Sequence, residues 1–112
     1  MNELPYRASR ILRALGNPLR YRLIKRLLRY PATPGQLAEE FHRSIFVISR
    51  HLGVLRSLDL VCYTPKPPTY LYEAKYPSLQ AILRVAEVCA TRIREADAAC
   101  ADSASEWEPP LI

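Results

Sequence analysis

The chain has 112 residues, which is enough for one small domain with a modest hydrophobic core. Lys and Arg total 16 and Asp and Glu total 11, so the net charge is +5. The charge is uneven: residues 1–76 hold 13 basic and 5 acidic side chains, whereas residues 77–112 hold 3 basic and 6 acidic ones. A basic body with an acidic end predicts that the body meets a polyanion, although a solvated surface on an ordinary basic protein would give the same totals.

Composition and motifs also exclude several classes of protein. No segment approaches the roughly 18 to 20 apolar residues of a transmembrane helix. No signal peptide is visible, so we expect a cytoplasmic protein with no membrane partner. Three cysteines without Cys-x-x-Cys spacing argue against a disulfide scaffold. We expect no enzyme, because the chain has no Gly-rich phosphate loop, no His pair with metal spacing and no nucleophile beside a base.

Residues 1–30 are expected to form two helices. In the first, which ends at about residue 15, apolar side chains recur at helical spacing: Leu4, Ala8, Ile11, Leu12 and Leu15. Gly16-Asn17-Pro18 then predicts a C-terminal cap, an N-cap and the first position of the next helix. The second helix ends at Tyr30-Pro31, and its apolar stripe is Leu19, Leu23, Ile24, Leu27 and Leu28.

Residues 33–58 predict a helix, a turn and another helix. Thr33-Pro34 has the N-cap chemistry that opens a helix, whose expected buried face is Leu37, Ala38 and Phe41. His42-Arg43 is the expected turn, and Ser44 is a good N-cap for the helix that follows. At about 100° per residue, that helix buries Ile48, Leu52 and Leu55, and its outward side carries Phe46, Ser49, Arg50, Gly53 and Ser57.

Two short strands follow, over Val61–Thr64 and Thr69–Glu73, because both segments are rich in β-branched and aromatic residues. Three prolines make the tip between them stiff. The predicted fold class is therefore mainly α with a small β-hairpin. A helix that offers one face, followed by a hairpin, is the layout of a winged helix-turn-helix, which places the helix in the DNA major groove and rests the hairpin on the flanking backbone.

A last helix is predicted from Pro77-Ser78 to about Cys100. Its apolar positions alternate in steps of three and four, as in a heptad seam: Leu79, Ile82, Ala86, Cys89, Ile93, Ala96 and Cys100. A helix that lies along its own domain usually has a wider stripe, so we favour pairing with a second copy. We expect a domain over residues 1–100, dimerised through helices at about 1–15 and 78–100, and a flexible tail over 101–112 with Trp107 as a candidate anchor.

Several segments, in order and spacing, resemble the ArsR/SmtB-type winged-helix repressors. These segments are LRALGNPLRYRLIKRLL, TPGQLAEEF, and S-x-x-x-I-S-R-H-L-x-x-L-R followed by LV and a short hairpin, together covering residues 10–76. The resemblance implies a homodimer that binds a near-palindromic operator in double-stranded DNA and releases it on sensing a metal ion, a metalloid or a redox signal. It also implies that the first and last helices form the dimer interface, which adds Leu4, Ala8 and Ile11 to the seam.

The resemblance further implies which residues contact DNA. Ser49 and Arg50 would be polar contacts, and Arg50 has the geometry to take a guanine edge with two hydrogen bonds, or a phosphate. Phe46 cannot hydrogen-bond but can sit against a thymine methyl group. The other expected contacts, most of them to the DNA backbone, are Ser44, Ile45, His51, Arg56, Thr33, Gln36, Thr64 and Lys66.

This sequence also departs from the family's pattern. Ile45, Phe46 and Gly53 make the reading face less polar than is usual, and His42 and Asp59 stand where glycine is common. The other possible role for Phe46 is that it covers a gap or a partner surface. Two alternatives therefore stay open: a winged-helix module for protein interaction without specific DNA binding, and a constitutive DNA binder that senses no ligand.

The three thiols, Cys62, Cys89 and Cys100, are candidates for a redox switch or for a site that takes As(III) or another soft metal. The family's metalloid site needs a Cys-x-Cys in the third helix, which TPGQLAEEF lacks. In an antiparallel helix pair, Cys89 would face its counterpart near the two-fold axis. The alternative is that each Cys is a small apolar packing residue.

Overall fold

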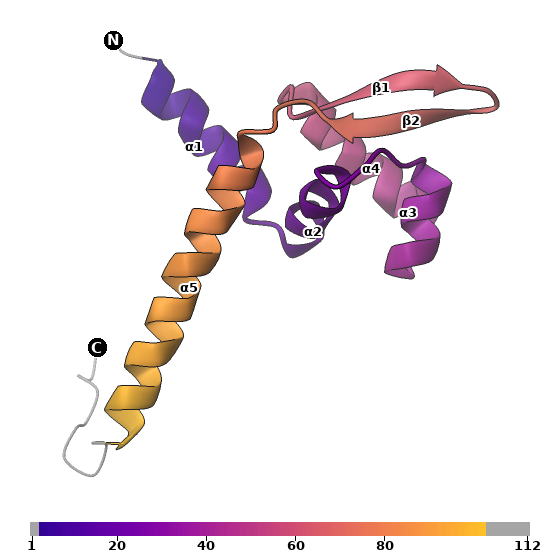
Figure 1. Ribbon diagram of the computed structural model, residues 1–112. Helices are drawn as coiled ribbons and strands as arrows, with labels where there is room; N and C mark the ends of the chain where they lie inside the picture. The colour runs from indigo at the N-terminus through magenta and orange to yellow at the C-terminus, as the bar shows by residue number, and fades with distance from the viewer. Residues whose placement is uncertain (1–2, 103–112) are drawn as a thin grey trace. The chain divides into compact units, whose positions relative to one another are not determined.

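In a computed structural model, which describes residues 3–102, five helices and one β-hairpin follow in the predicted order (Figure 1). Two compact units divide the chain, one that ends at Gln80 and one that begins at Ala81. Trp107 and most of the expected tail lie outside the described residues. The elements are α1 (Leu4–Leu15), α2 (Pro18–Leu27), α3 (Pro34–Phe41), α4 (Ile45–Ser57), β1 (Val61–Lys66), β2 (Thr69–Ala74) and α5 (Leu79–Asp102).

All three predicted N-caps are confirmed. The side chain of Asn17 accepts from Leu19 N at 3.0 Å and from Arg20 N at 3.1 Å, and Ser44 Oγ accepts from Val47 N at 3.2 Å. Each cap satisfies backbone N–H groups that have no partner inside their own helix, which is worth about 1 kcal/mol per cap. These short-range bonds explain why three short helices begin where they do.

The cap predicted for Gly16 differs from expectation. Gly16 follows α1, but its φ of −70° is right-handed and asks nothing special of a glycine. The helix end that does need a left-handed residue is that of α3, where His42 has φ 53°. The second helix also ends earlier than predicted, at Leu27 rather than at Tyr30.

The core of the first unit is built from buried residues of α1, α2, α3, α4 and β1. In α4, the predicted buried residues Ile48, Leu52 and Leu55 are all inaccessible to solvent. α4 packs against α2, α3 and β1. The other fully or almost fully buried apolar side chains of this unit are Ala14, Leu15, Leu23, Ile24, Leu27, Ala32, Leu37, Leu60, Val61 and Leu79. Burial of one side of α4 therefore fixes which side it turns outward.

The hairpin pairs Val61 with Ala74 and Lys66 with Thr69 in antiparallel register. Both strands are longer than predicted. β1 continues through Pro65 to Lys66, which an edge strand tolerates, and β2 continues to Ala74. The tip shrinks to Pro67-Pro68, whose peptide bond is cis. A further bridge anchors the hairpin, since Ala32 N donates to Tyr72 O at 2.9 Å and Tyr72 N donates to Ala32 O at 2.8 Å.

The second unit, as far as it is described, is α5 from Ala81 onward. Leu79, at the start of this helix, is buried and Ile82 is half-buried, but the later predicted seam positions are exposed: Ala86, Cys89, Ile93, Ala96 and Cys100. Leu83 is also buried, which the predicted seam omitted. None of the helices within residues 3–102 is both long and apolar enough to span a membrane.

The core assignment predicts opposite outcomes for two large apolar residues of α4. Leu52→Ala should lower the free energy of unfolding by about 2–5 kcal/mol, because Leu52 is fully buried and its truncation leaves a cavity. Phe46→Ala should change it by no more than about 0.5 kcal/mol, because Phe46 is 83% exposed. Urea titrations followed by circular dichroism measure both values, and equal losses would contradict the assignment.

Candidate nucleic-acid interface

The turn between α3 and α4 sets the angle between these two helices. His42 adopts φ 53° and ψ 45°, a left-handed conformation that histidine accepts more readily than most residues but less readily than glycine. Arg43 N donates to Ala38 O at 3.1 Å, which closes the end of α3. Ser44 then caps α4, so the turn has no spare residue and the two helices form a helix-turn-helix.

The outward side of α4 carries the predicted readers. Ser49 and Arg50 are exposed, and Phe46 is 83% exposed, which is unusual for a large apolar side chain. Ile45 beside it is 46% exposed. A Cβ built at Gly53 would meet no atom within 4 Å, so packing within the described residues does not require a glycine there. This face therefore carries the guanidinium of Arg50 and the hydroxyl of Ser49 beside an apolar patch, and its backbone is uncovered at Gly53.

His51 lies apart from these readers, at the edge of the buried side. It is half-buried, and its Nδ1 accepts from Arg20 Nε at 3.2 Å. Burial lowers the pKa of His51, and the charges of Arg20 and Arg50 lower it further. The ring is thus held in its neutral form with one nitrogen already engaged, and it links α4 to α2.

At the start of α3, Thr33 and Gln36 bond to each other. Thr33 Oγ1 accepts from Gln36 N at 3.2 Å, and Gln36 Oε1 accepts from Thr33 N at 2.9 Å. This capping box was not predicted, although the T-x-x-Q spacing of TPGQ is its sequence signature. The Gln36 amide nitrogen and the Thr33 hydroxyl proton remain available to a phosphate at this helix N-terminus.

The register of the hairpin separates the candidate contacts of its strands. Successive strand residues point to opposite faces, so Thr64 and Lys66 share one face, while Tyr63, Tyr70 and Tyr72 share the other. Arg56 belongs with the tyrosines, because its guanidinium lies 4.5 Å from the centre of the Tyr63 ring. The structure therefore does not bring Arg56 together with Thr64 and Lys66.

The tyrosine face of the hairpin is a feature that sequence reasoning missed. Tyr63 and Tyr70 meet edge to face with ring centres 4.9 Å apart, and Tyr72 lies 5.5 Å from Tyr63. Tyr70 remains 48% exposed. The signal was present in the sequence, since Tyr70 and Tyr72 alternate with Thr69 and Leu71 at strand period.

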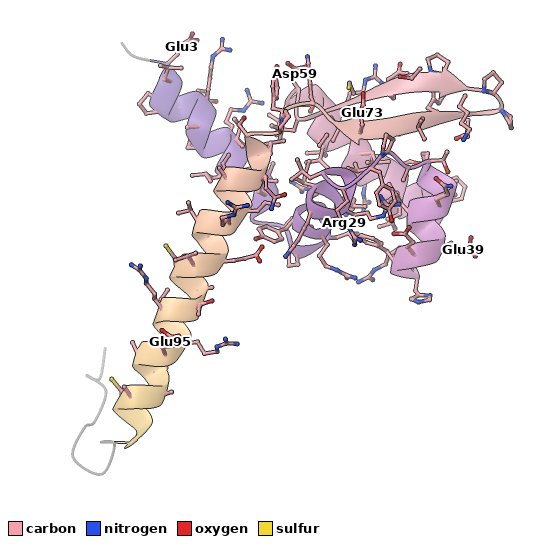
Figure 2. All side chains as sticks on the ribbon, in the orientation of Figure 1. Glu3, Arg29, Glu39, Asp59, Glu73 and Glu95 are labelled. Carbon is pink, nitrogen blue, oxygen red and sulfur yellow. The ribbon has the colours of Figure 1, made fainter. Side chains whose placement is uncertain are left out.

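The base of the hairpin is fixed by an ionic cluster at Asp59 (Figure 2). Asp59 has φ 63°, where the resembling family often has glycine. Its carboxylate accepts from Lys75 Nζ at 2.6 Å and from Tyr76 OH at 3.0 Å. These hydrogen bonds hold the pKa of Asp59 below its usual value, and the bond that Lys75 donates to Asp59 raises the pKa of Lys75. The cluster ties Asp59, the second residue after α4, to the segment after β2.

The three cysteines belong to two elements, Cys62 to β1 and Cys89 and Cys100 to α5. Cys62 is half-buried, and burial together with the Glu73 carboxylate 3.8 Å away raises the pKa of its thiol, which opposes thiolate formation. Cys89 and Cys100 are exposed on α5. Among residues 3–102, no three His, Cys, Asp or Glu side chains come together in a way that could hold a metal ion.

Comparison with known proteins gives matches by structure. No family model matches the sequence, and no curated protein matches it. NolR from Sinorhizobium fredii is 29% identical, with a TM-score of 0.69 over 77% of this chain and 87% of that one. The transcriptional regulator HlyU from Vibrio vulnificus is 24% identical, with a TM-score of 0.66 over 76% of this chain and 88% of that one.

A third solved structure has a fuller description. It is the homodimeric winged helix-turn-helix DNA-binding domain of Mb0332 from Mycobacterium bovis, described as a possible ArsR-family transcriptional regulator. It is 19% identical, with a TM-score of 0.73 over 83% of this chain and 86% of that fragment. The winged helix-turn-helix fold predicted from the sequence is thereby confirmed.

Proposed function

We propose that this chain, which has the fold of the ArsR/SmtB-type winged-helix regulators, is a homodimeric transcriptional repressor that binds a near-palindromic operator. The observation that carries the proposal is the outward face of α4, where Ser49, Arg50 and a largely exposed Phe46 stand on a helix whose other side is fully buried. The net charge of +8 over residues 1–76 supports a polyanionic partner.

Each group on this face has a role that its chemistry allows. Arg50 reads a guanine through two hydrogen bonds in the major groove, and Ser49 adds a hydrogen bond to a neighbouring base. Phe46 contacts a thymine methyl group, and Gly53 lets the DNA backbone approach closely. Thr33 and Gln36 hold a phosphate, while Thr64 and Lys66 on one face of the hairpin position the flanking backbone. This division predicts a contribution from apolar contact beside the polar readers.

Arg50→Ala tests the reading face. Sites are first selected from random duplex DNA with the native protein, and affinities for the best site are then measured at several salt concentrations. Loss of a bidentate guanine contact should cost about 1–3 kcal/mol and relax preference at one base pair. The control, Arg7→Ala, removes one exposed charge from α1 and should leave base preference unchanged.

Two outcomes would count against the proposal. Native affinity and base preference in Arg50→Ala would remove Arg50 from the reading face. Failure of the native protein to enrich any sequence would favour the protein-interaction alternative, in which Phe46 meets a partner protein.

The proposed dimer would bury apolar side chains that are exposed to solvent in the single chain. Ile93 on α5 is 63% exposed, and Val85, which is 62% exposed, extends the apolar surface of that helix. On α1, Leu4 is 70% exposed and Leu12 is 59% exposed. Clusters of this kind are uncommon on monomers, and two helices of this length can bury them against a second copy. A two-fold dimer would present two copies of α4 to a palindrome.

Ile93→Asp tests this interface. A carboxylate at the seam would have to lose its hydration on dimerisation, so we expect a monomer in sedimentation equilibrium and weak binding to the palindromic site. Thr91→Asp is the matched control, because residue 91 lies on the opposite side of α5 and should leave the dimer intact. A dimeric Ile93→Asp protein would contradict the seam.

We further propose that Cys89 acts as a thiol switch in this regulator. The thiol is exposed, and an antiparallel seam from Leu79 to Cys100 would bring the two copies of Cys89 to its middle. Two thiols that meet there can form one disulfide across the dimer when an oxidant such as hydrogen peroxide takes their two electrons. Cys62 is the weaker candidate, because its raised pKa disfavours the reactive thiolate.

Non-reducing electrophoresis after mild peroxide treatment tests the switch. We expect a band at twice the chain mass from the native protein and from Cys100→Ser, but not from Cys89→Ser. The same treatment should change operator affinity only in the proteins that cross-link. A native protein that stays at the mass of one chain would contradict the switch.

A further inference from the structure

A pocket of about 340 Å³ lies within the first unit, outside the proposed reading face. It is lined by the polar side of α1, the first turn of α2 and the C-terminal half of α4. The volume is within the range of small-molecule sites, which begin at about 300 Å³. The pocket is therefore large enough for a small organic ligand.

The charged side chains that line this pocket are all positive. Three guanidinium groups line it, from Arg10, Arg13 and Arg20, and none of its lining residues is acidic. The acid nearest in sequence, Asp59, already bonds to Lys75 at 2.6 Å. Three like charges around one cavity repel one another, and an anion between them would remove that repulsion.

The three arginines differ in how they are held. Arg20 is fixed, since its Nε donates to His51 and its Nη1 donates to Ala14 O at 3.4 Å. Arg10 lies over the Tyr6 ring, 6.0 Å from its centre. The guanidinium groups of Arg10 and Arg13 make no hydrogen bond or ion pair with any residue between 3 and 102. Most of the guanidinium donors around the pocket are thus left for a ligand.

The rest of the lining is mixed. Ser9 and Ser57 bring hydroxyl groups whose protons go to backbone carbonyls of Tyr6 and Val54, at 2.7 Å each, so their oxygens can accept. Val54 and Leu58 supply apolar surface on the α4 side. Several cationic donors beside apolar surface suit a ligand that combines an anionic group with an apolar body.

The pocket would remain open in the proposed dimer. On α1, Leu4, Ala8 and Ile11 share one side, whereas Ser9 and the two arginines Arg10 and Arg13 lie on the opposite side. A second copy that packs on the apolar stripe of α1 therefore leaves its polar side uncovered.

We propose that this pocket binds a small organic anion, with a phosphate or carboxylate group held by Arg10, Arg13 and Arg20 and an apolar part against Val54 and Leu58. Because Val54 and Ser57 belong to α4, Leu58 directly follows it, and Arg20 bonds to His51 of the same helix, a bound anion contacts the proposed reading helix directly. Its effect on operator affinity rests on the proposed function, whereas its binding does not.

Calorimetric titration in the absence of DNA tests the binding. The probes are phenyl phosphate, inorganic phosphate and uncharged phenol, added to the native protein, to the Arg10→Ala/Arg13→Ala variant and to Arg7→Ala/Arg84→Ala. The last variant is the control, because it also removes two exposed arginines but neither lines the pocket. Circular dichroism checks that all three proteins are folded.

We expect saturable binding of phenyl phosphate to the native protein and to the control, and at least roughly tenfold weaker binding to Arg10→Ala/Arg13→Ala. Inorganic phosphate should bind more weakly than phenyl phosphate, and phenol should not bind. Equal affinities in the two double variants, equal binding of phenol, or no saturable binding at millimolar concentrations would each overturn the proposal.

The phosphate of DNA is the other source of the same chemistry, and salt-dependent DNA binding separates the two. If Arg10→Ala/Arg13→Ala reduces the slope of log K against log salt by about two while phenyl phosphate fails to bind the native protein, the pocket belongs to the DNA interface. That result would overturn the small-molecule site and leave the proposed function standing.

Discussion

The burial of one side of α4 is the constraint on which the rest of the structure depends. Ile48, Leu52 and Leu55 are fully inaccessible to solvent and pack among α2, α3 and β1. Because a helix turns about 100° per residue, burial of these three positions forces Phe46, Ser49 and Arg50 outward. A change that loosened this packing would therefore move the proposed reading groups without altering their chemistry.

Hydrogen bonds and an ion pair fix the segments on either side of α4. The turn before it is closed by a left-handed His42, and Asp59, two residues after its end, is tied to Lys75 and Tyr76. The hairpin that follows is bridged to Ala32 through two backbone hydrogen bonds. Few conformations satisfy all of these bonds together, so the helix and the hairpin keep a fixed relation within this unit.

The net charge of the basic body overstates what is available to a polyanion. Arg26 is engaged by Glu40, with Nε to Oε2 at 2.9 Å and Nη2 to Oε1 at 3.1 Å, and it lies 4.4 Å from the centre of the Tyr30 ring. Arg22 and Arg56 likewise stack on aromatic rings, those of Phe41 and Tyr63. Such arginines fix aromatic groups in place. Within residues 3–102, the guanidinium groups of Arg13 and Arg50 are not engaged in this way, so they are more available to a polyanion.

The order of the elements, the N-caps and the buried side of α4 were all predictable from the sequence. They depend on residues within a few positions of one another, as with Asn17 and the backbone N–H groups it accepts. The tyrosine face of the hairpin and the capping box at Thr33 were equally local, and their spacing was visible in the chain.

Tertiary structure alone decided the rest. The bond between Arg20 and His51 joins residues 31 apart, and the bridge from Ala32 to Tyr72 spans a still longer stretch of chain. The gathering of Arg10, Arg13 and Arg20 around one cavity depends in the same way on how three helices pack. Periodicity shows which side of a helix is apolar but not which neighbour will cover it, because that choice is made by the packing of the whole core.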